Sequence, residues 1–140
     1  MRRERLTTRR SPDARHDFLV ELRGEPLPGV RLTLRLVPDL LVPDPASVVA
    51  YLAEFAGFAD GLEALAIAIL DDVNNELVPR WVEVAVESDT PLPHRVVIED
   101  RQPTWDNPRL FPLSPLGRGP GWGGGTEWIF ENPRCASPSP

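Results

Sequence analysis

Glu63 is the residue whose setting in the sequence most suggests chemistry. It is the single polar residue of the segment LEALAIAIL, residues 62–70. The residues three, four and seven positions after it, Ala66, Ile67 and Leu70, are apolar and share its side of a helix. The spacing therefore predicts that Glu63 lies at the end of a buried stripe.

Two interpretations of Glu63 fit this pattern. Asp60 and Glu63 match an acidic variant of the capping box, and a glutamate in the first helical turn favours the helix dipole. Alternatively, Glu63 is a buried acid that binds a ligand. The two roles are compatible with each other.

Few other side chains are suited to catalysis. All fifteen Lys and Arg residues are arginine, so no lysine can form a Schiff base or bind phosphate in a loop. The single cysteine, Cys135, lies in the segment RCASPSP, so we expect neither a disulfide framework nor a cysteine-based zinc site. His16 and His94 are too few for a three-histidine zinc centre. We therefore expect no metal.

Charge is unevenly distributed along the chain. The formal net charge is −6, but residues 1–16 hold six arginines and two acids, which gives +4 there and −10 elsewhere. We predict that residues 1–16 form a solvated, disordered basic arm; contact of this arm with nucleic acid or an acidic partner is the alternative. Because the rest of the chain is acidic, we do not expect nucleic acid to be the main ligand.

The elements that would position Glu63 follow from residue periodicity. Alternating apolar and polar residues predict strands at 18–23, 30–37, 80–87 and 94–100. A helix is predicted within 42–57, because Asp44 can cap free amides and Pro45 suits the first helical position. A second helix is predicted over 62–77, since Pro79 forbids its continuation.

The order strand, strand, helix, helix, strand, strand predicts an α+β fold, in which a four-stranded antiparallel sheet carries two helices on one face. We assign this domain to residues 17–102. Residues 103–140 contain eight prolines and six glycines, which predicts a mostly disordered tail. Neither a transmembrane segment nor a signal peptide is evident, so we expect a cytoplasmic protein without membrane contact.

Five stretches of the sequence together resemble one known family. They share one register from the second predicted strand to the third: LRLVPD (34–39), YLAEF (51–55), Glu63, ILDDV (69–73) and VPRWVEV (78–84). In this order they are similar to the tunnelling folds (T-folds), and within these to the NADPH-dependent 7-cyano-7-deazaguanine reductases (QueF-type nitrile reductases) of queuosine biosynthesis, a tRNA modification. The likeness covers roughly residues 30–87.

The resemblance implies an assembly and a ligand. In the T-folds, copies of a ββααββ unit assemble into an oligomeric barrel with ligand sites between subunits, so the resemblance implies a homo-oligomer. A glutamate at the position of Glu63 binds the amidine-like edge of a pterin or purine there. A carboxylate can accept two parallel N–H bonds from such an edge, and the pairing is strong where water is excluded.

The catalytic residues of the reductases are not found at the matching positions. Their nucleophilic cysteine corresponds to about Glu21, and a carboxylate is a poor nucleophile toward a nitrile. Their proton-donating aspartate corresponds to about Pro28, and the histidine before the binding glutamate corresponds to Leu62. The resemblance therefore predicts that nitrile reduction is lost in the isolated chain.

The NADPH-binding motifs are retained only in part. The family signature Glu-Ser-Lys-Ser corresponds to DPAS (44–47), which keeps Asp44 and Ser47 in kind but lacks the lysine that meets phosphate. The Arg-Gly-Gly turn corresponds to LPHR (92–95), in which Arg95 keeps a positive charge. NADPH is thus the cofactor that the resemblance implies.

Three functional hypotheses follow. The chain binds a deazaguanine, purine or pterin through Glu63 at a subunit interface; or it is a non-catalytic structural or partner-binding oligomer that kept only the fold; or an active reductase forms when another chain supplies the missing groups.

Overall fold

The computed structural model describes residues 2–110 of the 140-residue chain. The chain divides into two compact units, Met1–Trp105 and Asp106–Pro140. All helices and strands of the described residues belong to the first unit. The predicted division at residues 17 and 103 remains a prediction, and most of the predicted tail lies outside the described residues.

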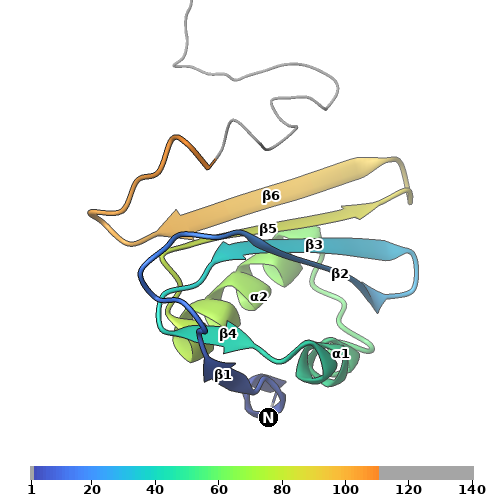
Figure 1. Ribbon diagram of the computed structural model, residues 1–140. Helices are drawn as coiled ribbons and strands as arrows, with labels where there is room; N and C mark the ends of the chain where they lie inside the picture. Colours follow the sequence, from blue (N-terminus) through green and yellow to red (C-terminus); the bar gives the residue numbers. More distant parts are fainter. Residues whose placement is uncertain (1, 111–140) are drawn as a thin grey trace, which may run out of the picture. The chain divides into compact units, whose positions relative to one another are not determined.

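A four-stranded antiparallel sheet forms the centre of the first unit (Figure 1). Its strands are β2 (Val20–Leu27), β3 (Val30–Val37), β5 (Trp81–Ser88) and β6 (His94–Arg101), in the spatial order β2-β3-β5-β6. Two helices, α1 (Pro45–Ala53) and α2 (Leu62–Leu77), follow β3 in the chain. This arrangement confirms the predicted α+β class and antiparallel sheet.

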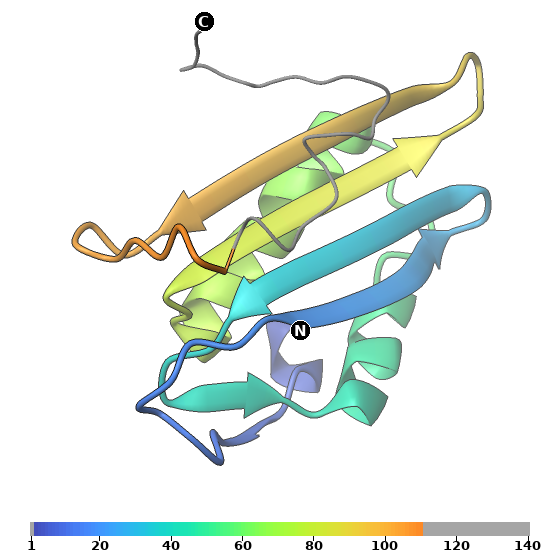
Figure 2. The same cartoon turned by 45° about the horizontal axis from the view of Figure 1, so that its top comes forward.

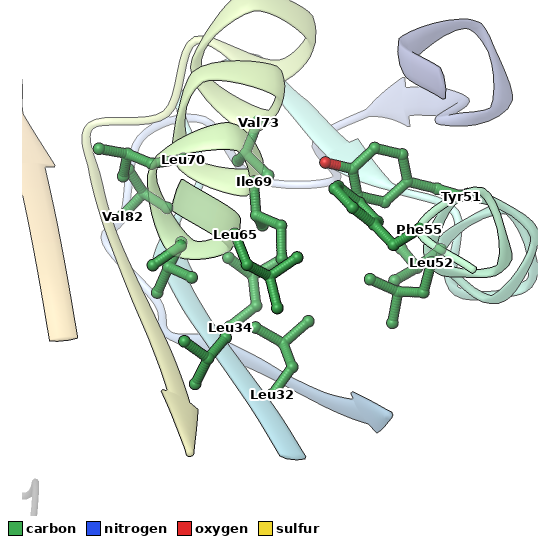
Figure 3. Packing of buried hydrophobic residues seen from close by; sticks show 14 of the residues in the cluster. Leu32, Leu34, Tyr51, Leu52, Phe55, Leu65, Ile69, Leu70, Val73 and Val82 are labelled. Atoms are coloured by element: carbon green, nitrogen blue, oxygen red, sulfur yellow. The ribbon is translucent and has the colours of Figure 1, made fainter. Parts of the chain in front are cut away.

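The two helices cover one face of the sheet, as the alternation of residues predicts (Figure 2). Alternate residues of β3 and β5 are buried on that face: Leu32, Leu34, Leu36, Val82, Val84 and Val86. Figure 3 shows Tyr51 and Leu52 of α1, and Phe55 just after this helix, beside Leu65 and Ile69 of α2 in the same core. The helices are thereby held against the sheet by a single apolar cluster.

Helix α1 begins where the sequence predicts but without the predicted capping bond. Asp44 is extended at the N-cap position, and its side chain makes no capping hydrogen bond. Instead, the Ser47 hydroxyl donates to the Asp44 carbonyl oxygen, at 2.7 Å. The helix ends at Ala53, four residues before the end of the predicted range at Gly57. Gly57 itself has a positive φ of 82°.

Helix α2 has the predicted bounds and a different start. Its N-cap is Gly61, with φ 96°, and no side chain caps it. The predicted capping box of Asp60 and Glu63 is therefore wrong, because Asp60 lies one residue too early. At the other end, Val78 closes the helix in the left-handed conformation, with φ 46° and ψ 57°.

The N-terminal segment contains regular structure where a disordered arm was predicted. A 3-10 helix η1 (Arg2–Arg5) precedes β1 (Thr8–Arg10), which pairs antiparallel with β4 (Leu41–Pro43). Leu6 is 5% exposed and belongs to the core cluster. These contacts could not be predicted from composition, because the six arginines of residues 1–16 dominate it. One buried leucine and a three-residue strand produce no recognisable pattern in such a segment.

Within the part of the chain that the structure describes, no helix has the length and apolar character needed to cross a bilayer.

Candidate functional site

A cavity of about 350 Å³ lies at the N-terminal end of α2, beside the hairpins of the sheet. Its walls come from the β2–β3 hairpin, the loop before α2, the first turns of α2 and the β5–β6 connection. The lining residues are Leu27, Pro28, Val30, Phe58, Ala59, Gly61, Leu62, Leu65, Ser88, Thr90, Pro91 and His94. Nine of these twelve residues are apolar or glycine, and the polar side chains are those of Ser88, Thr90 and His94.

These polar groups come from the end of β5 and the start of β6. The Ser88 hydroxyl accepts from the Thr90 amide at 3.2 Å. The His94 Nδ1 atom lies 2.8 Å from the Leu92 carbonyl oxygen, so it carries the proton of the neutral ring. The His94 Nε2 atom is then an acceptor, which suits a ligand with an N–H or O–H group.

Glu63 lies at the rim of the cavity and is not one of its lining residues. A Cβ placed on the lining residue Gly61 would be 3.7 Å from the Glu63 Oε1 atom, so the carboxylate leans back over this glycine. The Glu63 side chain is exposed and makes no hydrogen bond or ion pair with the residues that the structure describes. Its two oxygens are therefore free to accept N–H bonds.

The predicted buried stripe beyond Glu63 is only partly present. Ala66 and Leu70 are buried, whereas Ile67 is 48% exposed. Glu63 and Ile67 lie four residues apart and share an exposed strip of α2. In a single chain, Glu63 is thus not the buried acid that the sequence suggested.

The positions matched to the reductase catalytic residues divide into two groups. Pro28 and Leu62, matched to the proton donor and the histidine, both line the cavity. Glu21, matched to the nucleophile, is exposed, pairs with Arg23 at 2.6 Å and does not line the cavity. The cavity wall contains no cysteine, and Cys135 lies outside the described residues.

The positions matched to the NADPH motifs do not meet at the cavity. Ser47 is buried, and its hydroxyl accepts from the Thr7 amide at 3.0 Å, which ties α1 to the N-terminal segment. Arg95 lies on β6, where its Nε atom is 3.5 Å from a Glu87 carboxylate oxygen. Neither these two residues nor Asp44 lines the cavity, and a role for them in NADPH binding stays a prediction.

No group of three His, Cys, Asp or Glu residues within residues 2–110 has the geometry to hold a metal ion.

A row of charges crosses the sheet on the face away from the helices. The register aligns Glu21, Arg35, Glu83 and Glu99 on the four neighbouring strands. Burial raises the pKa of the Glu83 carboxyl, and the Arg35 guanidinium, 3.4 Å away, opposes this rise. Sequence periodicity predicts which residues of each strand lie on its polar face. It does not predict the register between strands, which aligns these four charges in a row.

Comparison with known proteins bears on the fold. No protein-family model and no curated protein sequence matches the chain. Among solved structures, the chain is similar to an archaeosine synthase described as QueF-Like, determined in the apo form, with a TM-score of 0.52. The two are 21% identical, and the match covers 61% of this chain and 94% of that one. The chain has a QueF-like fold. At this identity the similarity establishes the QueF-like fold alone.

Proposed function

We propose that the chain binds a flat, nitrogen-rich heterocycle of the deazaguanine, purine or pterin class at the cavity beside Glu63. The observation that carries this proposal is the unpaired Glu63 carboxylate at the rim of an apolar cavity. The volume of 350 Å³ lies near the lower end of the range for ligand pockets, about 300–1,000 Å³. The QueF-like fold supports a ligand of this class.

The two sides of the site complement the two parts of such a ligand. Apolar side chains, including Phe58, Leu62 and Leu65, offer contact to the faces and edges of a ring. The Glu63 carboxylate can accept two parallel N–H bonds from a ring N–H and its exocyclic amine. His94 Nε2 can accept a further bond from the ligand.

A second subunit would complete this site. Glu63 and Ile67 are exposed in the single chain, and a charge-assisted pair is strong only where water is excluded. In the described residues, the edge strands β2 and β6 each pair on one side only, and unpaired edges favour association. We therefore propose a homo-oligomer in which a neighbouring subunit covers Glu63.

Nitrile reduction is not part of the proposal for the isolated chain. The cavity wall offers the hydroxyls of Ser88 and Thr90 but no thiol. The NADPH positions Ser47 and Arg95 are engaged in other contacts. If NADPH and a reductase activity are involved, a second kind of chain has to supply the nucleophile.

A structural or partner-binding oligomer is the second candidate function. The position of Glu21 favours this candidate. Glu21 occupies the position matched to the nucleophile, yet it belongs to the charged row on the sheet face away from the helices and does not line the cavity. A protein that kept the fold for assembly alone would need no ligand in the cavity.

A pair of ligands distinguishes the two candidates. 7-Deazaguanine has an exocyclic amine that would donate a hydrogen bond to Glu63, and 7-deazahypoxanthine lacks this amine. Losing one N–H bond to a charged acceptor costs about 1.5–3 kcal/mol, so 7-deazahypoxanthine should bind roughly 10- to 150-fold more weakly in a calorimetric titration. 7-Cyano-7-deazaguanine and a pterin extend the series.

The outcomes separate the candidates directly. Discrimination for the exocyclic amine that disappears in Glu63→Gln supports recognition by this carboxylate. Absence of binding by every member of the series, with an intact oligomer in light scattering, would favour the structural candidate.

A further inference from the structure

A second cavity, of about 380 Å³, lies at the C-terminal end of α2, away from the site beside Glu63. It is formed by the end of β1, the β3–β4 turn, the start of β4 and the last residues of α2. Its lining residues are Arg10, Asp39, Leu40, Leu41, Leu77 and Val78. The nearest α2 residues of the two linings, Leu65 and Leu77, are twelve positions apart, which is about 18 Å along the helix axis.

The walls of this second cavity include two large apolar side chains that remain in solvent. Leu40 is 65% exposed and Val78 is 59% exposed. Single exposed apolar residues are ordinary on protein surfaces, but these two flank the same hollow, together with Leu41 and Leu77. The hollow therefore offers an apolar wall on which a ligand could bury surface.

One charge at this cavity is available to a ligand. Asp39 is already engaged: its Oδ1 atom accepts from Arg80 at 3.2 Å and its Oδ2 atom from Gln102 at 3.1 Å. The Arg10 guanidinium makes no hydrogen bond or ion pair with any residue that the structure describes. The group left to recognise a ligand is thus a cation beside an apolar wall.

The backbone at the cavity is strained at a wall residue. Val78 has φ 46° and ψ 57°, a left-handed conformation that is a genuine outlier for a β-branched residue. A glycine or asparagine would close the helix there without this strain. Strain of this kind is found at binding sites, where the side chain itself is needed.

We propose that this second cavity binds a small amphipathic anion, with its apolar body between Leu40 and Val78 and its carboxylate or sulfonate on Arg10. The charge follows from the free guanidinium and the apolar body from the wall. This site is independent of the proposed heterocycle site, since the two have no lining residue in common.

A competition assay tests the charge and the apolar contact separately. The fluorescence of 1-anilinonaphthalene-8-sulfonate, an apolar anion, reports occupancy. Octanoate and 1-octanol, which share a chain length and differ in charge, then compete with this probe. We expect octanoate to compete at concentrations about tenfold below those of 1-octanol, because only the anion can pair with Arg10.

Arg9 provides a matched control for Arg10. The two are neighbours on β1, are both exposed and make no side-chain bonds in the described residues, but only Arg10 lines the cavity. Arg10→Gln should remove the preference for octanoate over 1-octanol, whereas Arg9→Gln should keep it. Leu40→Gln, which removes apolar surface without adding a charge, should weaken the probe and both competitors alike.

Three results would overturn the proposal. They are failure of the folded protein to bind the probe, equal competition by octanoate and 1-octanol in the wild type, and equal effects of the two arginine substitutions. Circular dichroism on each variant confirms that the fold is intact, so a loss of binding is assigned to the cavity.

Discussion

Replacing Tyr51 by phenylalanine tests how helices α1 and α2 are held together. Tyr51 of α1 is 1% exposed, and its hydroxyl donates to the Asp72 Oδ2 atom of α2 at 2.6 Å. Asp72 is 4% exposed and also accepts from the Arg2 Nε atom, at 2.6 Å. Burial and the hydrogen bond to Asp72 raise the pKa of Tyr51, so this hydroxyl stays protonated and donates throughout the neutral range.

The size of the effect follows from what phenylalanine keeps. The ring would remain buried, and its edge-on contact with Phe55, at 5.4 Å between ring centroids, would be preserved. The loss is therefore one hydrogen bond to a charged acceptor, about 1.5–3 kcal/mol of unfolding free energy. Asp72 keeps its ion pair with Arg2, so the lower half of this range is expected. In a body of this size the melting temperature should fall by roughly 6–15 °C.

Urea unfolding followed by circular dichroism measures this loss, and a double-mutant cycle assigns it. Tyr51→Phe, Asp72→Asn and the double variant should show a coupling energy of about 1 kcal/mol or more. A Tyr51→Phe variant within about 0.5 kcal/mol of the wild type, the range of an ordinary surface substitution, would refute the bond as a support of the helix pair. Two residues of the cavity wall depend on the position of these helices: Phe58 comes after α1, and Leu62 is the first residue of α2. If the Tyr51–Asp72 hydrogen bond holds the helices in place, its loss should also weaken ligand binding at the cavity beside Glu63.

Four further predictions concern other parts of the chain. Val78→Gly should raise the unfolding free energy by about 0.5–1 kcal/mol in urea titrations, since relief of left-handed strain exceeds the entropy cost of glycine, while anion binding at the second cavity falls. Glu83→Gln should stabilise the protein at pH 7. Because burial raises the pKa of Glu83, the wild type loses stability as pH rises from the ordinary pKa of about 4.3 through the raised pKa. The stabilisation by glutamine should therefore vanish in thermal scans below about pH 4. The purified chain should not oxidise NADPH in response to 7-cyano-7-deazaguanine, and Cys135→Ala should leave the melting temperature unchanged; nitrile-dependent loss of absorbance at 340 nm would contradict the first expectation.

The central elements could be predicted because their signals are local. The alternation of Leu32, Leu34 and Leu36 with polar residues defined β3 to the residue, and Pro79 placed the end of α2. Helix starts were predicted less well, since Asp44 and Asp60 carry capping side chains that the structure does not use. Caps depend on the exact path of the preceding loop, which the residue types do not specify.

The candidate site could not be predicted from the sequence, because its residues meet only in the tertiary structure. Pro28, Leu62 and His94 come from three separate segments, and only the fold brings them to one cavity. The exposure of Glu63 and Ile67 could not be predicted either, because an apolar residue at helical spacing does not reveal whether a sheet or another subunit covers it. The same limit hid the second cavity, whose residues Arg10 and Val78 lie far apart in sequence.

Recognition of the heterocycle by Glu63 is most directly tested by the dissociation constant of 7-deazaguanine for wild type and Glu63→Gln, measured by calorimetry beside the melting temperatures of the same samples. Glutamine keeps the shape but presents an N–H donor where a second acceptor is needed. Loss of the charge-assisted pair should weaken binding by on the order of 30- to 1,000-fold, with little change in melting temperature. Asp60→Asn, which removes a neighbouring exposed carboxylate outside the cavity wall, should leave the affinity within about twofold of the wild type. A lower melting temperature for Glu63→Gln with unchanged affinity would show that Glu63 serves only the start of the helix and would contradict the proposed function.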